Sequence, residues 1–133
     1  MILVDSSVLI DVIEDQKEWL EWSVKKLHQC AMQDALCINI VIYAEIARSF
    51  VSVSDLNHFL SQAQISIEAI PNAAAFAAAK AHQAYRAAGG TRSNTLPDFF
   101  IGAHAQFCKF PLLTRDPSKI KTYFPKVNLI HPV

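Results

Sequence analysis

Hydrophobic residues follow two alternating patterns along the chain. Short, nearly continuous apolar runs predict buried strands, and longer stretches with apolar residues three and four positions apart predict amphipathic helices. The predicted strands cover residues 2–4, 35–38, 65–70 (a short strand or an extended link), 112–114 and 127–130. Helices are predicted over residues 16–33, 39–50, 72–88, 97–107 and 117–123. One further helix is predicted to start after residue 5 and another at residue 54. Because strands alternate with helices, we predict one α/β domain over residues 1–133, with three α/β/α layers around a mostly parallel sheet.

Polar residues at the starts of the apolar stretches predict helix caps. Asn39 and Asn72 are each expected to cap the helix that they begin. Asn94 or Thr95, followed by Pro97, supplies a cap and a first-turn proline for a later helix. These signals set the expected helix boundaries.

Composition and charge fit a single domain and restrict how it meets other molecules. Of the 133 residues, 52% are hydrophobic, which is enough for one sizeable core. Twelve Lys and Arg balance twelve Asp and Glu, so no global basic field attracts nucleic acid. Any such contact must come from local groups, such as Lys25-Lys26 or Lys119, Lys121 and Lys126.

The cysteine count and the N-terminal residues bear on location. Three cysteines, with no C-x-x-C pair, are expected to be reduced thiols of an intracellular protein. No basic segment precedes the first apolar run, and no window approaches about eighteen uncharged apolar residues. We therefore expect a soluble cytoplasmic protein without a signal peptide or a membrane span.

Four carboxylates occupy positions that a parallel sheet brings to one edge. Asp5 and Asp116 follow strands, Asp98 lies in the first turn of a helix, and Glu45 lies in the helix after the second strand. Ligands of open α/β sheets bind outside the carboxyl ends of the strands, so we expect these acids to meet there. Simpler roles are open for each, because the aspartates suit helix N-termini and Arg48 is near enough in sequence to pair with Glu45.

Carboxylates gathered at one edge repel one another unless a cation neutralises them. An all-oxygen ligand set favours Mg²⁺ or Mn²⁺ over zinc. The five histidines form no H-x-x-x-H pair, and His104 is expected to be a packing or surface residue. The chain has neither a Gly-rich phosphate loop nor a serine in a nucleophile elbow. Acid-cluster metal chemistry remains, whose usual role is to activate water for attack on a phosphodiester.

Five segments resemble a known family. They are ILVDSSVLID at residues 2–11, Glu45, LPDFFIGAHA at residues 96–105, LTRD at residues 113–116 and YFP at residues 123–125. In this order and spacing the chain resembles the PIN-domain ribonucleases, and within them the VapC toxins of bacterial toxin–antitoxin pairs. The resemblance spans nearly the whole chain and implies a single PIN-like domain.

The resemblance implies an endoribonuclease that depends on Mg²⁺ or Mn²⁺. The residues that would hold the metal or its waters are Asp5, Glu45, Asp98 and Asp116. Ser7 and Thr114 stand where the family has supporting polar groups near the metal. Cleavage would leave 5′-phosphate and 3′-hydroxyl ends. The resemblance also implies a homodimer and a cognate antitoxin that covers the active site, and it leaves the number of metal ions open.

Arg92 and Arg115 are candidates for contacting RNA phosphates, because a guanidinium group suits bidentate contact with phosphate. The alternative for both is a structural or surface role.

Two other functions are compatible with the acid cluster. A phosphoryl-transfer domain of the receiver or phosphatase type also gathers acids and Mg²⁺ at strand ends, but it needs a second acid two residues after the nucleophile, where this chain has Ser7. A non-catalytic PIN-like protein-interaction module is the other alternative. The presence of all four acids argues against it, since a binding role does not require them.

Overall fold

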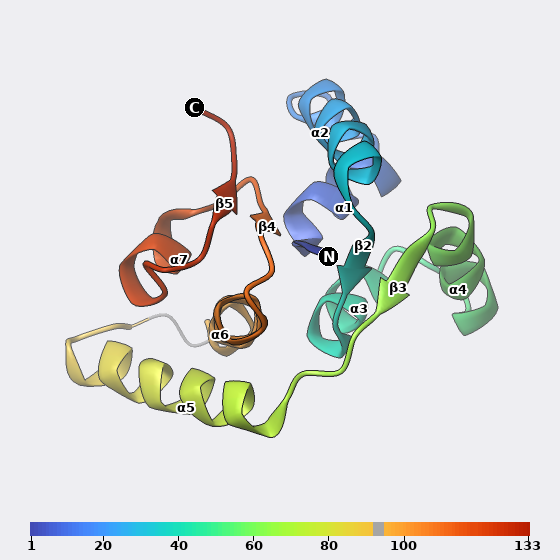
Figure 1. Cartoon of the computed structure of the whole chain (residues 1–133). Helices are drawn as coiled ribbons and strands as arrows, with labels where there is room; N and C mark the ends of the chain where they lie inside the picture. The colour runs from blue at the N-terminus through green and yellow to red at the C-terminus, as the bar shows by residue number, and fades with distance from the viewer. Residues whose placement is uncertain (92–94) are drawn as a thin grey trace.

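The computed structural model describes residues 1–91 and 95–133, and within them five short strands form one parallel sheet (Figure 1). The strands are β1 (Ile2–Val4), β2 (Leu36–Ile38), β3 (Ile65–Ile67), β4 (Leu112–Leu113) and β5 (Leu129–Ile130). Their order is β3-β2-β1-β4-β5, and every neighbouring pair is parallel. The predicted parallel α/β fold is confirmed, although the third strand is shorter than residues 65–70.

Helices connect the strands and enclose the sheet. They are α1 (Ser6–Ile13), α2 (Leu20–Gln33), α3 (Ile40–Ala47), α4 (Val53–Gln62), α5 (Asn72–Ala87), α6 (Leu96–Cys108) and α7 (Ser118–Tyr123). Figure 1 shows α5 lying across α6, which is seen end-on, and α6 also packs against α3 and α7. In the part of the chain that the structure describes, no helix is long and apolar enough to cross a bilayer.

The strand order reverses direction at β1. The chain steps from β1 to β2 and β3 on one side, and then returns to place β4 and β5 on the other. In a parallel sheet, such a reversal opens a crevice beyond the carboxyl ends of the two strands where it occurs. Val4 pairs with Leu113, so the residues that follow β1 and β4 leave the sheet at the same level.

The central strands are buried along their whole length. All residues of β1, β2 and β4 are buried, which accounts for their continuous apolar sequences. In the edge strand β3, Ile65 is buried while Ser66 and Ile67 are exposed. The core therefore surrounds the strands from which the crevice opens.

Two of the predicted caps can be compared with the structure. Asn39 caps α3 as predicted, because its side chain accepts a hydrogen bond from the Ile42 backbone N–H at 3.0 Å. The prediction for Asn72 is wrong by one position. Pro71 occupies the N-cap of α5, with the extended backbone (φ −60°, ψ 146°) that the proline ring favours, and Asn72 is the first helical residue.

The helix predicted to begin at residue 54 begins at Val53. Ser52 is its cap, and its side chain accepts a hydrogen bond from the Asp55 backbone N–H at 3.0 Å. Thr95 takes the N-cap position of α6 without a side-chain cap hydrogen bond, and Asn94, the other residue proposed there, lies outside the described residues.

Helices α6 and α7 approach closely at Gly102. A Cβ atom at this position would overlap the ring of Phe124, the residue that follows α7, and would touch Ile120. Phe124 also contacts Phe99 of α6, with ring centroids 6.0 Å apart. The missing side chain therefore allows α7 to lie against α6.

A buried hydrogen bond joins α6 to the start of α3. The Asn39 side-chain oxygen is used by the Ile42 backbone, so its Nδ2 group donates to His104 Nδ1, 3.0 Å away. His104 is therefore the neutral tautomer that carries its proton on Nε2. The side chain is fully buried, as expected for a packing residue, and this burial lowers the pKa of His104 from its ordinary value.

We predict that this histidine makes stability depend on pH. Because burial lowers its pKa in the native state, the unfolded chain takes up the proton first as the pH falls below 6.5. The contribution to the free energy of unfolding is complete above that pH and declines below it, by at most about 1.4 kcal/mol per pH unit. Denaturant unfolding at several pH values should show a shallower slope for His104→Gln, which cannot be protonated.

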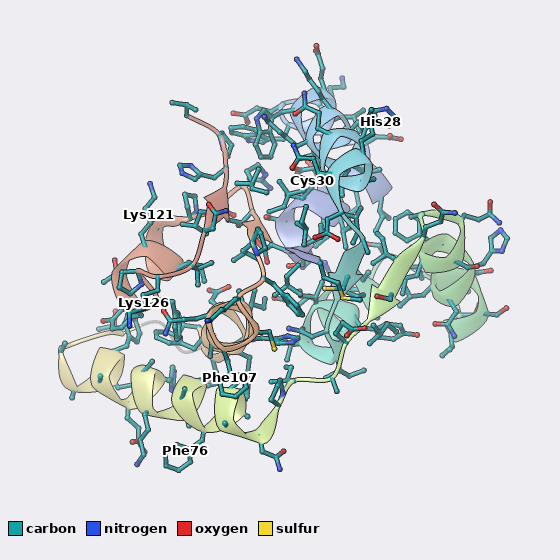
Figure 2. The ribbon with its side chains drawn as sticks, in the orientation of Figure 1. His28, Cys30, Phe76, Phe107, Lys121 and Lys126 are labelled. Carbon is teal, nitrogen blue, oxygen red and sulfur yellow. The ribbon has the colours of Figure 1, made fainter. Side chains whose placement is uncertain are left out.

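His28→Gln is the matched control, because His28 is exposed on α2 (Figure 2). It should keep the slope of the unsubstituted chain. Equal slopes for all three proteins would contradict the prediction.

Candidate active site

All four predicted acids line one cleft beyond the carboxyl ends of β1 and β4. The cleft has a volume of about 570 Å³, and its acids are Asp5, Glu45, Asp98 and Asp116. They come from the end of β1, from α3, from the first turn of α6 and from the loop after β4. Residues far apart in sequence therefore meet where the strand order reverses.

Two hydroxyl groups fix the carboxylate of Asp5. Ser7 Oγ donates to Asp5 Oδ2 at 2.7 Å, and Thr114 Oγ1 donates to the same oxygen at 2.8 Å. Asp5 occupies the N-cap position of α1 without making a side-chain cap hydrogen bond. The simpler role of helix capping therefore does not account for Asp5.

Backbone groups of the loop after β4 fix the two hydroxyls in turn. The Arg115 backbone N–H donates to Ser7 Oγ at 3.2 Å, and the Asp116 backbone N–H donates to Thr114 Oγ1 at 3.1 Å. Each hydroxyl accepts from the backbone and directs its own proton to Asp5. This arrangement places Ser7 and Thr114 against Asp5, and the role near a metal that the resemblance implies for them stays a prediction.

Ser6 holds Glu45, which the sequence analysis missed. Ser6 Oγ donates to Glu45 Oε1 at 2.9 Å and so joins the start of α1 to α3. The signal was available, because Ser6 precedes an apolar helix and directly follows Asp5.

The acids disfavour one another's charged forms. Burial raises the pKa of Asp5, and the negative charge of Asp98 raises it further, against the lowering effect of the hydroxyls. Burial likewise raises the pKa of Glu45, with further contributions from Asp5 and Asp98, while the positive charge of Arg48 lowers it. Three carboxylates thus lie within electrostatic reach of each other, a condition that a bound cation would relieve.

Asp116 lies at the exposed side of the cleft. The N-cap of α7 is Pro117, so Asp116 is not the cap that the simpler interpretation required. Its backbone is fixed by Thr114, and its side chain borders the same cleft as the other acids.

The residues of the cleft fit a hydrated divalent cation. No three Asp, Glu, His or Cys side chains in residues 1–91 and 95–133 converge closely enough to enclose a bare ion. Mg²⁺ retains several waters in proteins and is held through one or two carboxylates, so an all-oxygen set lining a cleft of this size suits it. Direct coordination by all four acids stays a prediction.

Of the two residues predicted to contact RNA, the structure describes only Arg115. Arg92 lies outside the described residues. Arg115 lines the cleft, and its guanidinium donates to Asp11 through Nε at 2.9 Å and through Nη2 at 3.1 Å. A role for Asp11 was not predicted, although its position three residues after Val8 places both residues on the buried face of α1.

Two members of the predicted basic group are exposed to solvent. Lys121 is exposed on α7 and Lys126 is exposed shortly after it (Figure 2). Helix α7 contributes Ser118 and Ile120 to the cleft lining. Neither lysine is among the residues that line the cleft.

Comparison with protein families identifies the fold. The family model of the PIN domain matches residues 2–124, so the chain belongs to the PIN domain family, as the sequence motifs implied. No curated protein sequence matches the chain.

Solved structures with the same fold include toxin–antitoxin complexes. VapBC2 from Rickettsia felis, bound to a promoter DNA fragment, matches with a TM-score of 0.74 and 17% identity over 100% of both chains. VapBC-1 from nontypeable Haemophilus influenzae matches with a TM-score of 0.72 and 16% identity over 98% of both chains. VapBC from Salmonella typhimurium, bound to DNA, gives 0.68 and 13% over 98% of both. At these identities the likeness establishes the fold.

We predict that Asp5→Asn stabilises the protein in the absence of divalent cations. The amide oxygen can still accept from Ser7 and Thr114, but the charge repelled by Asp98 is gone. Because the native pKa of Asp5 is raised, the stability that its protonated form contributes is present below the ordinary value of 3.8 and is lost as the pH rises through the native pKa. Thermal unfolding in EDTA should show a rise of a few degrees, since about 1 kcal/mol corresponds to about 3–6 °C in a domain of this size.

Adding Mn²⁺ should raise the melting temperature of the unsubstituted chain and leave that of Asp5→Asn nearly unchanged. Asp55→Asn, an exposed acid in the first turn of α4, is the control and should respond to Mn²⁺ normally. A lower melting temperature for Asp5→Asn in EDTA would show that repulsion does not dominate at this position.

Proposed function

We propose that the protein is a metal-dependent endoribonuclease and the toxin of a VapBC-type toxin–antitoxin pair. The observation that carries the proposal is the meeting of four carboxylates from separate segments in one cleft at the switch point of the sheet. Charge repulsion and burial act against the ionised forms of Asp5 and Glu45 there, which is typical of a site that holds a cation. Membership of the PIN domain family supports the nuclease assignment.

Asp5, Glu45, Asp98 and Asp116 would hold Mg²⁺ or Mn²⁺ directly or through its waters. When bound, such an ion activates water at neutral pH and neutralises the charge that develops during in-line displacement at phosphorus. The serine and threonine hydroxyls keep two of the acids in fixed orientations, so little reorganisation is needed as the reaction proceeds. Hydrolysis would give 5′-phosphate and 3′-hydroxyl ends.

Positively charged side chains would bring the RNA to this acidic cleft. Arg48 and Arg115 line it, and Lys121 lies on the adjoining helix. Local cations of this kind suit binding of the phosphate backbone, which the neutral overall charge does not favour. Arg92 is retained as a further candidate.

A cognate antitoxin and a second copy of the chain would be the protein partners, and the site of action would be the cytoplasm. The solved structures that share the fold support the first of these, because they are toxin–antitoxin complexes. An antitoxin bound over the cleft would silence the enzyme by excluding RNA.

We predict that brief expression in a bacterial host produces new RNA ends at a few discrete sites. Mapping of 5′-phosphate ends should detect them with the unsubstituted chain and should find none with Asp98→Asn, since the loss of one acid of the cluster removes most of the activity. Asp55→Asn, which changes an acid outside the cleft, should cleave normally.

The purified protein should cleave the same sites with Mg²⁺ or Mn²⁺ and should stop in EDTA. Cleavage that persists in EDTA, or that Asp98→Asn retains in full, would refute the metal-dependent mechanism. Growth and RNA unaffected by any of the proteins would instead favour the non-catalytic interaction module.

A further inference from the structure

Asp11 is a fully buried carboxylate outside the acid cluster. It lies on α1, and its side chain accepts three hydrogen bonds from two residues. Ser23 of α2 donates to Oδ2 at 2.7 Å, Arg115 Nε donates to Oδ2 at 2.9 Å, and Arg115 Nη2 donates to Oδ1 at 3.1 Å. A buried charge is costly unless it is paired and hydrogen-bonded, and these contacts meet both conditions.

The same contacts hold the guanidinium of Arg115 in one place. Asp11 takes one edge of the group, and the ring of Trp19 lies against it, 5.5 Å from the ring centroid to the guanidinium carbon. Within the described residues, the Nη1 amino group makes no hydrogen bond. Arg115 is one-quarter exposed and lines the cleft, whereas Asp11 is inaccessible behind it.

Because Arg115 is partly exposed and Asp11 is buried, the positive charge of this ion pair is the one that borders the cleft. The carboxylate is shielded by its own partners, while the guanidinium borders the opening that holds the four acids. Those acids repel an RNA phosphate, so a phosphate next to the reacting one needs a cation in a fixed position. Arginine suits this task because one edge can bind a carboxylate while the remaining N–H groups bind phosphate.

We infer, on the basis of the proposed nuclease function, that Asp11 is a positioning residue that holds Arg115 for contact with an RNA phosphate beside the scissile bond. Asp11 itself touches no substrate. Arg115 is tied to the metal-binding side of the cleft as well, because its backbone N–H donates to Ser7, which in turn donates to Asp5. The position of the phosphate contact is therefore fixed relative to the acid cluster.

A double-mutant cycle on RNA binding tests the inference. All proteins carry Asp98→Asn to prevent cleavage, and binding of a labelled, mixed-sequence single-stranded RNA is measured in EDTA at several salt concentrations. Arg115→Met should weaken binding about tenfold, the size of one charge-assisted hydrogen bond, and should reduce the slope of log Kd against log salt by about 0.7. Asp11→Asn should weaken binding by a similar factor when Arg115 is present and should have no further effect with Arg115→Met.

Two further proteins separate positioning from stability. Arg115→Lys keeps a cation beside Asp11 if Arg115→Met does not fold, and it should bind RNA as weakly, because one ammonium group cannot serve the carboxylate and a phosphate through separate nitrogens. Asp34→Asn breaks an ion pair with the N-terminus, away from the cleft, and should leave RNA binding unchanged. The melting temperature of every variant, including the Asp11→Asn, Arg115→Met double variant, shows which substitutions change only the stability of the fold.

The outcomes distinguish this inference from the proposed function. Independent, additive effects of Asp11 and Arg115 on RNA affinity, or a loss of stability without a change in affinity, would overturn the positioning role while cleavage by the unsubstituted chain still supports the nuclease. Coupled effects on binding, together with no cleavage by the unsubstituted chain, would support the positioning role and overturn the proposed chemistry.

Discussion

The structure depends on keeping several carboxylates close together while partly removing them from water. Each of these conditions raises the pKa of Asp5 and Glu45, and together they oppose folding. The fold compensates with neutral donors: three hydroxyl groups bind the acids, and the backbone of the loop after β4 holds two of those hydroxyls. The acids are thereby held in fixed orientations by groups that carry no charge.

The topology explains how a short chain brings these acids together. Strands β1 and β4 are neighbours in the sheet but are separated by about a hundred residues of sequence, and the chain between them supplies both α3 and α6. Each acid therefore comes from a different segment of the chain. The Asn39–His104 hydrogen bond then ties α3 to α6 inside the core, so the helices that carry Glu45 and Asp98 are fixed relative to each other from below the cleft.

The sequence predicted what local pattern and strand-end chemistry control. The strands, the order of helices and the meeting of all four acids followed from apolar runs and from the position of Asp5 after a buried strand. The sequence did not reveal partners that are distant along the chain, such as Ser23 and Arg115 for Asp11. A buried acid cannot be told from an exposed one until the residues around it are known. The misplaced cap at Asn72 has a local cause, since the fixed backbone of Pro71 already supplies the extended residue that precedes a helix.

The close approach at Gly102 has a consequence for the size of the opening. Helix α7 contributes Ile120 to the cleft lining and α6 contributes Asp98, and the two helices touch through the hydrogen atom of a glycine. The distance between these two helices therefore depends on the absence of a side chain at Gly102. A methyl group at this position would push the two helices apart, so enlargement of a single buried residue offers a way to change the shape of the cleft without altering any residue that lines it.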